Sequence, residues 1–159
     1  MGELTHIDEK GNATMVDISG KNVTGRMAVA SGNIKVSSEV MEAIIANQVK
    51  KGDVLGTARI AGIMAAKKTP ELIPLCHTLL LNKVSIDFDI KKEEGIIECI
   101  CRIKLEGKTG AEMEALTGVS TALLTVYDMC KAIDKTMVIG DIRLEEKDGG
   151  KTGHYIRKE

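Results

Sequence analysis

Aromatic residues are scarce in this sequence, which contains no Trp, one Phe and two Tyr among 159 residues. Proteins that bind single-stranded nucleic acids stack the bases on aromatic side chains, and few such side chains are present here. The 22 Lys and Arg residues are balanced by 23 Asp and Glu residues, so the net charge of −1 provides no general attraction to nucleic acid or to an anionic membrane. A nucleic-acid-binding function is therefore not expected.

Long apolar runs are also missing. No segment approaches the roughly 20 apolar residues of a membrane helix, and residues 1–10 lack the apolar centre of a signal peptide. Without such a leader, the cysteines, which include Cys76 and Cys130, are expected to be reduced thiols in a cytoplasmic protein. Their spacing contains no CxxC motif or zinc-finger pattern, so the sequence requires no metal or other cofactor. Cys99 and Cys101 share one face of a strand and are expected in the core.

The chain contains enough apolar material for one core. Hydrophobic residues make up 43% of the sequence, which argues against a disordered protein. Residues 1–25 are polar and contain scattered glycines, and they predict a mobile N-terminal arm. Residues 26–147 are expected to form a single α+β domain that carries the functional site, and residues 148–159 a flexible C-terminal tail.

Helical periodicity identifies three longer helices. The first is expected between an N-cap at Ser38 and a stop at Gly52, and the second over residues 54–68 behind an N-cap at Asp53. The second is rich in Gly and Ala, which predicts close contact with a neighbouring helix. A third helix is expected over about residues 112–133. Its buried stripe is predicted to contain Leu116, Val119, Leu123, Val126, Cys130 and Ile133.

Alternating apolar residues predict four strands. They cover residues 26–36, with a bend or bulge at a glycine, residues 83–91, residues 96–106 and about residues 137–145. The middle two are joined by the turn KEEG and form a hairpin with one solvated face. The resulting order, β-α-α-β-β-α-β, indicates an α+β fold, a ferredoxin-like antiparallel sheet with helices packed on one face.

The tetrapeptide GKTG occurs twice, at residues 107–110 and 150–153, and raises the question of a phosphate-binding loop. A Walker A motif needs a further glycine five residues before its Gly-Lys pair. Arg102 and Glu145 occupy these positions, so a P-loop is excluded by the spacing. The first copy is instead expected to turn a strand into a helix.

Asp128 and Lys131 lie three residues apart on the third helix and are therefore neighbours. Such pairs are common on surfaces, where they contribute little stability. Within a cleft, the carboxylate could tune the lysine as an acid or a base. Glu112 falls on the apolar stripe, where its charge needs either a partner or a place beyond the edge of the core. Glu114 points elsewhere and could be solvated.

His77 lies in the apolar segment IPLCHTLLL and can be either a structural or a catalytic histidine. Its neighbour Cys76 gives no support for a Cys-His dyad, because adjacency in sequence does not orient a thiol toward an imidazole. Several cations at the ends of elements could converge on a polyphosphate, although each alone is an ordinary solvated side chain. They are Arg26, Lys51, Lys131, Lys147 and Lys151.

Four segments are similar to one known family. The strings MVDIS (residues 15–19), LIPLCH (72–77), GKTGAEMEALT (107–117) and YDMCKA (127–132) closely resemble the molybdenum cofactor biosynthesis protein C family, the cyclic pyranopterin monophosphate synthases. The resemblance extends over nearly the whole chain. It implies a lyase of molybdopterin biosynthesis that converts 3′,8-cyclo-7,8-dihydroguanosine 5′-triphosphate into cyclic pyranopterin monophosphate and diphosphate.

The resemblance also implies an assembly. Members of this family are expected to form homohexamers, built as trimers of dimers, with each active site shared across a dimer interface. Neither a nucleic acid nor a membrane is implied as a partner. Mg²⁺ could assist the departure of diphosphate, but no cluster of ligands in the sequence supports it.

The site residues of the family can be placed on matching positions of this chain. Asp128 corresponds to the active-site acid, with Lys131 as its catalytic neighbour. Thr78 stands where many relatives are expected to have proline, which leaves the backbone at His77 less constrained. The substrate-binding residues implied by the resemblance are Leu75, Cys76, His77, Met113, Glu114, Glu112, Lys51, Lys147 and Arg26.

Two other interpretations stay open. The chain could be a non-catalytic pterin- or nucleotide-binding subunit of the same fold, or an oligomeric structural protein whose small-residue helix is only an assembly surface. The presence of both Asp128 and Lys131 favours the enzyme, because a binding protein need not keep them.

Overall fold

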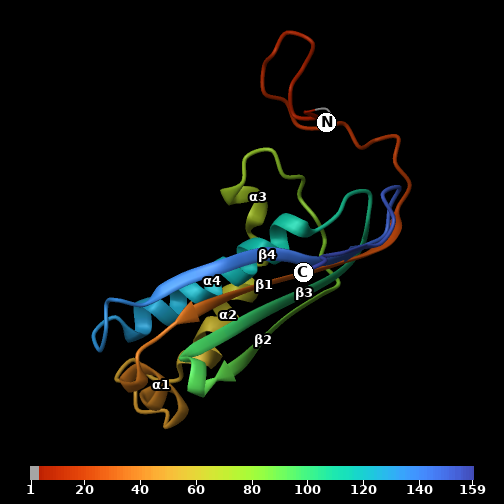
Figure 1. Cartoon of the computed structure of the whole chain (residues 1–159). Coiled ribbons are helices and arrows are strands. Elements are labelled where there is room, and N and C mark those ends of the chain that lie inside the picture. The colour runs from red at the N-terminus through yellow and green to blue at the C-terminus, as the bar shows by residue number, and fades with distance from the viewer. Residues whose placement is uncertain (1–3) are drawn as a thin grey trace.

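The computed structural model describes residues 4–159, which form one antiparallel sheet covered on one face by helices (Figure 1). The strand order is β2-β3-β1-β4-β5, and its first four strands match the ferredoxin-like arrangement. The predicted α+β fold is therefore confirmed. β1 shifts its register against β4 around Gly32, where the sequence predicts a bend. The strands are β1 (Thr24–Lys35), β2 (Lys83–Lys91), β3 (Ile96–Gly107), β4 (Val138–Asp148) and β5 (Tyr155–Ile156).

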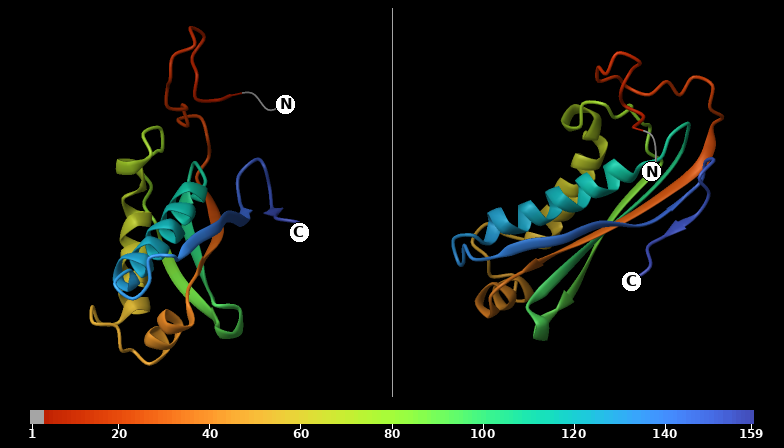
Figure 2. Two further views of the ribbon diagram at one scale, coloured as in Figure 1. Left: turned by 60° about the vertical axis from the view of Figure 1, so that its left-hand side comes forward. Right: turned by 45° about the horizontal axis from the view of Figure 1, so that its top comes forward.

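The two long helices, α2 and α4, lie side by side across this face of the sheet (Figure 2). Within residues 4–159, no helix is both long and apolar enough to cross a membrane. The helices are α1 (Ser38–Ile45), α2 (Val54–Lys67), α3 (Thr69–Leu72) and α4 (Glu112–Cys130), and a 3-10 turn (Lys92–Glu94) joins β2 to β3.

The core lies between the sheet and the two long helices. Alternate side chains of β1 and β3 point into it, as the two-residue period of a strand requires. Cys99 and Cys101 of β3 are fully buried there, as predicted, and burial raises the pKa of both thiols to about 12. They fill space in the core and are not reactive groups.

Small residues bring α2 and α4 close together. A Cβ on Gly62 of α2 would lie 2.8 Å from the carbonyl oxygen of Gly118 in α4, so a larger residue would separate the helices. Asp53 caps α2, because its carboxylate accepts the N–H of Gly56 at 3.0 Å. The predicted cap and the predicted helix contact are both confirmed.

The first predicted helix is shorter than expected. Ser37, not Ser38, caps α1, and the helix ends at Ile45 instead of continuing to Gly52. Asn47 adopts a left-handed conformation with φ of 54°, and the N–H groups that follow the helix bond back to its last turn as in a Schellman cap. Asparagine tolerates this conformation, which is why the helix stops before the glycine.

The last helix also ends early, at Cys130 instead of about residue 133. Lys131 is its C-cap, and the N–H of Lys131 donates to the carbonyl of Tyr127 at 2.9 Å. Ile133 was predicted in the buried stripe, but it is 44% exposed. The turn after the helix carries this side chain away from the core.

Both ends of the chain lie outside the layered body. Residues 4–23 contain one isolated bridge, between Ile7 and Ala13, and extend beyond the sheet (Figure 2). At the other end, the short β5 folds back onto β4. Residues 1–3 lie outside the described residues, and the mobility of residues 1–25 and 148–159 stays a prediction.

Candidate active site

The predicted site residues fall at the two ends of α4. Glu112 opens the helix and Asp128 lies near its end, sixteen residues later, which separates them by about 24 Å along the helix axis. We call the group made of Lys51, Asp128 and Lys131 the α4-C cluster. The α4-N cluster consists of Arg26, Cys76, Glu112, Glu114 and Lys147.

In the α4-C cluster, Asp128 contacts two lysines at once. Nζ of Lys131 is 2.7 Å from Oδ1 of Asp128, and Nζ of Lys51 is 3.0 Å from Oδ2. Lys51 comes from the turn between α1 and α2 and also donates to the backbone carbonyl of Asp128 at 3.1 Å. The predicted contact of Asp128 with Lys131 is confirmed, and Lys51 is a second partner that helical spacing could not reveal.

The hydrogen bonds and charges within the α4-C cluster set the protonation states of Asp128 and Lys131. The hydrogen bond from Lys131, followed by the one from Lys51, lowers the pKa of Asp128. The bond to Asp128 raises the pKa of Lys131. Asp128 is therefore a carboxylate and Lys131 an ammonium at neutral pH. All three side chains are about half exposed, so a ligand can reach them.

In the α4-N cluster, an ion pair ties the first turn of α4 to β4. Nζ of Lys147 is 2.8 Å from Oε1 of Glu112, and both side chains are little more than a quarter exposed. Gly110 lies next to the carboxylate, where a Cβ would collide with it. The sequence places the charge of Glu112 on the apolar stripe of the helix, where it needs a partner, and Lys147 is that partner.

Glu114 is buried, which rules out the solvated position that the sequence left open. It is 3% exposed, and burial raises its pKa to about 7. The loop that follows α3 runs past this end of α4 (Figure 1), and burial, together with the charge of Glu114, raises the pKa of Cys76 in that loop. Helical periodicity could not predict that this loop lies beside Glu114, because the loop itself has no periodic pattern.

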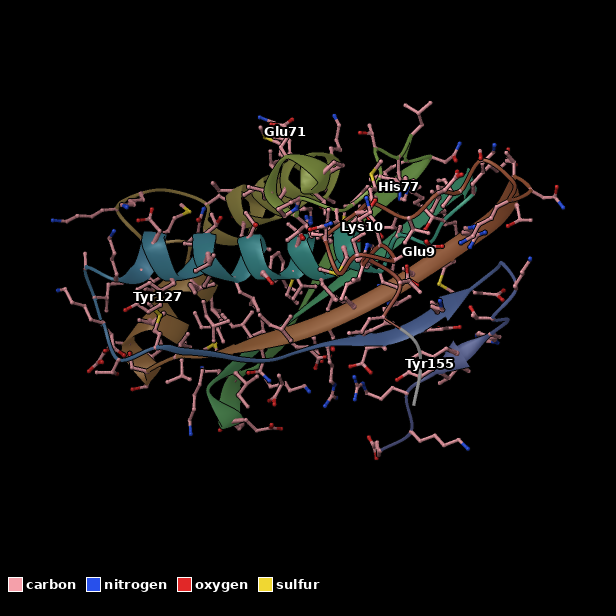
Figure 3. The ribbon with its side chains drawn as sticks, turned by 90° about the horizontal axis from the view of Figure 1, so that it is seen from above. Glu9, Lys10, Glu71, His77, Tyr127 and Tyr155 are labelled. Carbon is pink, nitrogen blue, oxygen red and sulfur yellow. The ribbon has the colours of Figure 1, made fainter. Side chains whose placement is uncertain are left out.

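His77 contacts the N-terminal arm. Its Nε2 donates to the carbonyl oxygen of Val16 at 2.6 Å, and Figure 3 shows the ring beside the arm. This contact leaves Nδ1 for another partner. Of the other predicted substrate-binding residues, Leu75 is half-buried in the same loop and Met113 is 39% exposed at the start of α4.

A cavity of about 460 Å³ opens beside Glu112 and Lys147, and we call it the cationic pocket. Both GKTG segments line it, although neither is a P-loop, and the arm closes a further side. Arg26 is fixed there because its Nε donates to the carbonyl of Gly107 at 3.0 Å. The positively charged residues that line the cationic pocket are Lys21, Arg26, Lys147 and Lys151.

Sequence reasoning missed the residues of this pocket that precede Arg26, which are Gly20, Lys21, Asn22 and Thr24. The Thr24 hydroxyl is buried and has no hydrogen-bond partner within residues 4–159. Such unpaired groups are rare in proteins. The only signal in the sequence was their position just before Arg26, in a segment interpreted as an arm.

Known proteins resemble this chain along its length. The family model described as MoaC family matches residues 15–150. The cyclic pyranopterin monophosphate synthase of Clostridium perfringens is 58% identical over 153 residues, which cover 96% of this chain and 97% of that protein. The synthase of Heliobacterium modesticaldum is 56% identical over 159 residues and covers both chains completely. The cyclic pyranopterin monophosphate synthase of Campylobacter lari is 56% identical over 154 residues, which cover 97% of this chain and 98% of that protein.

Proposed function

The chain belongs to the MoaC family, and from this premise we propose that it is a cyclic pyranopterin monophosphate synthase. It is a lyase of molybdenum cofactor biosynthesis that converts 3′,8-cyclo-7,8-dihydroguanosine 5′-triphosphate into cyclic pyranopterin monophosphate and diphosphate. Relatives that carry the synthase name match it over nearly their whole length. The structural observation that carries the proposal is the pocket that four cations line together with Glu112, whose carboxylate is paired with Lys147.

The cationic pocket suits the triphosphate. Expulsion of diphosphate needs positive charge aimed at the oxygen on which negative charge develops. Lys147 and Lys151 can supply this charge, and Arg26 can do so with its two terminal nitrogens, because only its Nε is engaged with the backbone at Gly107. We assign these three residues to the phosphates.

The ring rearrangement needs proton transfers. Lys131 rests as an ammonium beside the carboxylate of Asp128, so its first role is that of a proton donor. Glu114, with a pKa of about 7, can exchange a proton near neutral pH. Glu112 and Glu114 are expected to accept N–H groups of the substrate base, and His77 to contact the ring or the ribose.

One substrate can meet both clusters only if two protomers share the site. About 24 Å of helix separates the clusters within one chain, which is too far for one nucleotide to span. We infer that the α4-C cluster of one protomer faces the α4-N cluster of its partner, in a homohexamer built as a trimer of dimers. Exposed apolar side chains on the helical face support an assembly, because such patches are normally covered. They are Ile60, Met64, Leu72 and Leu124.

No resident cofactor and no divalent ion enters this proposal. The lysines and the arginine of the cationic pocket provide the charge, and within residues 4–159 no three His, Cys, Asp or Glu side chains gather as a metal site. A cytoplasmic location fits the four free cysteines. Turnover should persist after chelation of divalent ions; a complete loss that Mg²⁺ restores would contradict this proposal.

Turnover tests the function directly. Purified protein is mixed with the cyclic guanosine triphosphate precursor, and the release of diphosphate and the formation of the pterin product are followed for the native chain and for Asp128→Asn. Product from the native chain, with much slower formation by Asp128→Asn, would support the synthase. Tight binding without product would favour the non-catalytic pterin- or nucleotide-binding subunit instead, and a protein that binds no substrate would be left with a structural role.

A further inference from the structure

We propose that the hairpin of residues 148–157 is a fixed wall of the cationic pocket, and that His154 and Arg157 are positioning residues that hold Lys151 in this wall. The inference rests on the proposed function, because it takes the ligand of the pocket to be the phosphates of the substrate. Three sets of contacts carry it, one at the start of the hairpin and two at its end.

The first contact joins the start of the hairpin to Arg26. Gly149 and Gly150 have φ values of 100° and 79°, a left-handed conformation that glycine adopts without strain. A Cβ on Gly149 would collide with the carbonyl oxygen of Gly25, and one on Gly150 would collide with the guanidinium of Arg26. The two glycines therefore let the backbone of the hairpin lie directly against a residue of the pocket.

The second contact fastens the end of the hairpin to β4. β5 pairs with β4 opposite Lys147 and Glu146, and Figure 3 shows Tyr155 on this outer strand. Arg157 extends the ladder, because its N–H donates to the carbonyl of Glu145 at 2.8 Å and its Nε to the carbonyl of Leu144 at 2.9 Å. A strand of two residues is too short to hold by itself, so the docking depends on these additional bonds.

The third contact is made by His154. Its Nε2 donates to Oε1 of Glu146 at 2.7 Å, on the residue of β4 that precedes Lys147. Residues 149–153 are thus held at both ends, by Arg26 on one side and by β4 on the other. Lys151 lies in the middle of this held segment and lines the pocket.

The arrangement separates binding from proton transfer. Lys151 belongs to the cationic pocket, whereas Asp128 and Lys131 lie at the other end of α4. Loosening the hairpin should therefore raise KM and lower kcat/KM, because the phosphate contacts weaken, and it should leave the pH limbs of the rate profile in place, because the proton donor does not move.

Arg157→Ala and His154→Ala remove the holding contacts without altering a residue that lines the pocket. We expect each to weaken the binding of inorganic diphosphate, measured by calorimetry, by about tenfold and to raise KM by a similar factor. His154→Gln keeps a hydrogen-bond donor and should restore most of the affinity. Lys158→Ala is the matched control for Arg157→Ala, because it removes the same charge from a neighbouring exposed side chain.

Amide hydrogen exchange gives a second readout that does not depend on catalysis. Residues 149–156 should exchange faster in Arg157→Ala than in Lys158→Ala, while β1 and β3 exchange as in the native protein. Native diphosphate affinity and native exchange in both hairpin variants would overturn the inference, as would a native protein that binds no diphosphate.

The two proposals can fail separately. A native protein that binds diphosphate in a manner that depends on Arg157, but has no synthase turnover, would refute the proposed function and keep the hairpin as a phosphate-binding wall. Normal turnover with Arg157→Ala indistinguishable from Lys158→Ala would refute the positioning role and keep the synthase.

Discussion

Glu112 and Glu114 lie two residues apart in the first turn of α4, yet their carboxyl groups have opposite electrostatic surroundings. Lys147 holds its Nζ 2.8 Å from Glu112. Glu114 is 3% exposed, and its pKa is raised to about 7, mainly by burial and to a smaller extent by the charge of Glu112. Carboxyl groups whose surroundings differ in this way can take different roles in one site. Glu112 is positioned by a cation, and Glu114 can change its protonation near neutral pH.

Glu114 predicts a loss of stability between acidic and neutral pH. The unfolded carboxyl ionises around its ordinary pKa of 4.5, whereas the folded carboxyl stays protonated up to about pH 7. Unfolding therefore releases a proton in this window, and the free energy of unfolding falls as the pH rises from 4.5 to 7. The difference between the unfolded and the folded pKa of Glu114 corresponds to a loss of about 3 kcal/mol in the free energy of unfolding. Glu114→Gln should lose this dependence in urea unfolding at pH 4.5 and pH 8, at one protein concentration.

Glu106→Gln is the control for this experiment, because Glu106 is an exposed residue of β3. It should keep the native dependence on pH. If Glu114→Gln kept it as well, another group would be responsible for the loss of stability.

Lys131 should be needed for turnover but should contribute little to the binding of the substrate. Lys131→Met keeps most of the length without the charge, and we expect kcat to fall about 10²- to 10⁴-fold, the usual range for a general acid. Asp128→Asn removes the charge that raises the pKa of Lys131, so the basic limb of the kcat/KM profile should move to lower pH. A basic limb at the native position in Asp128→Asn would show that another group donates the proton.

Mixed oligomers can show whether two protomers share a site. Lys131→Met and Glu112→Gln disable different clusters, and each variant alone should have little activity. In a dimer with one copy of each, a shared arrangement creates one site with both substitutions and one site with neither. Equimolar variants refolded together should therefore recover about a quarter of the native turnover. Mixed oligomers that stay inactive would assign both clusters of a site to a single chain.

The fold was predictable where a regular period or a capping side chain decides it. The bounds of β2 and the start of α2 behind Asp53 agree with the sequence, because alternation and N-capping are local signals. The predicted ends of α1 and α4 were wrong. The observed ends depend on the left-handed conformation of Asn47 and on the turn after Cys130. A residue other than glycine in that conformation gives only a weak sequence signal.

The candidate site was harder to predict, because distant segments meet there. The spacing of Asp128 and Lys131 is local and was found, whereas the bond from Lys51 to Asp128 joins residues 77 positions apart. Glu114 is buried, and its charge raises the pKa of Cys76 in a loop without periodicity. The possibility that Glu114 is solvated was inferred from the helix alone, and that inference was wrong because it left out the loop.

Gly62→Ala should destabilise the contact between α2 and α4. Its Cβ would lie 2.8 Å from the carbonyl oxygen of Gly118, a backbone atom that cannot rotate away. Alanine gains about 1 kcal/mol of helix propensity, but overpacking costs about 1–3 kcal/mol, so we expect a lower Tm. Gly20→Ala is the control, because a Cβ there meets no atom within 4 Å. A higher Tm for Gly62→Ala would mean that the helices move apart at little cost.

Thr24 offers a test in which stability and binding should change in opposite directions. Its hydroxyl is buried at the wall of the cationic pocket and has no partner within residues 4–159. Thr24→Val removes the hydroxyl at nearly constant shape, so the free protein should gain about 1 kcal/mol of stability. If the hydroxyl serves a phosphate oxygen, the same substitution should weaken the binding of inorganic diphosphate about tenfold, measured by calorimetry.

A general loss of structure would lower both the Tm and the affinity, so it would not produce this result for Thr24→Val. Thr24→Ser keeps the hydroxyl and should bind diphosphate as the native protein does. Weaker binding in Thr24→Ser as well would attribute the effect to the lost methyl group. Native affinity in Thr24→Val would show that the unpaired hydroxyl serves no ligand, and its cost to the fold would then need another explanation.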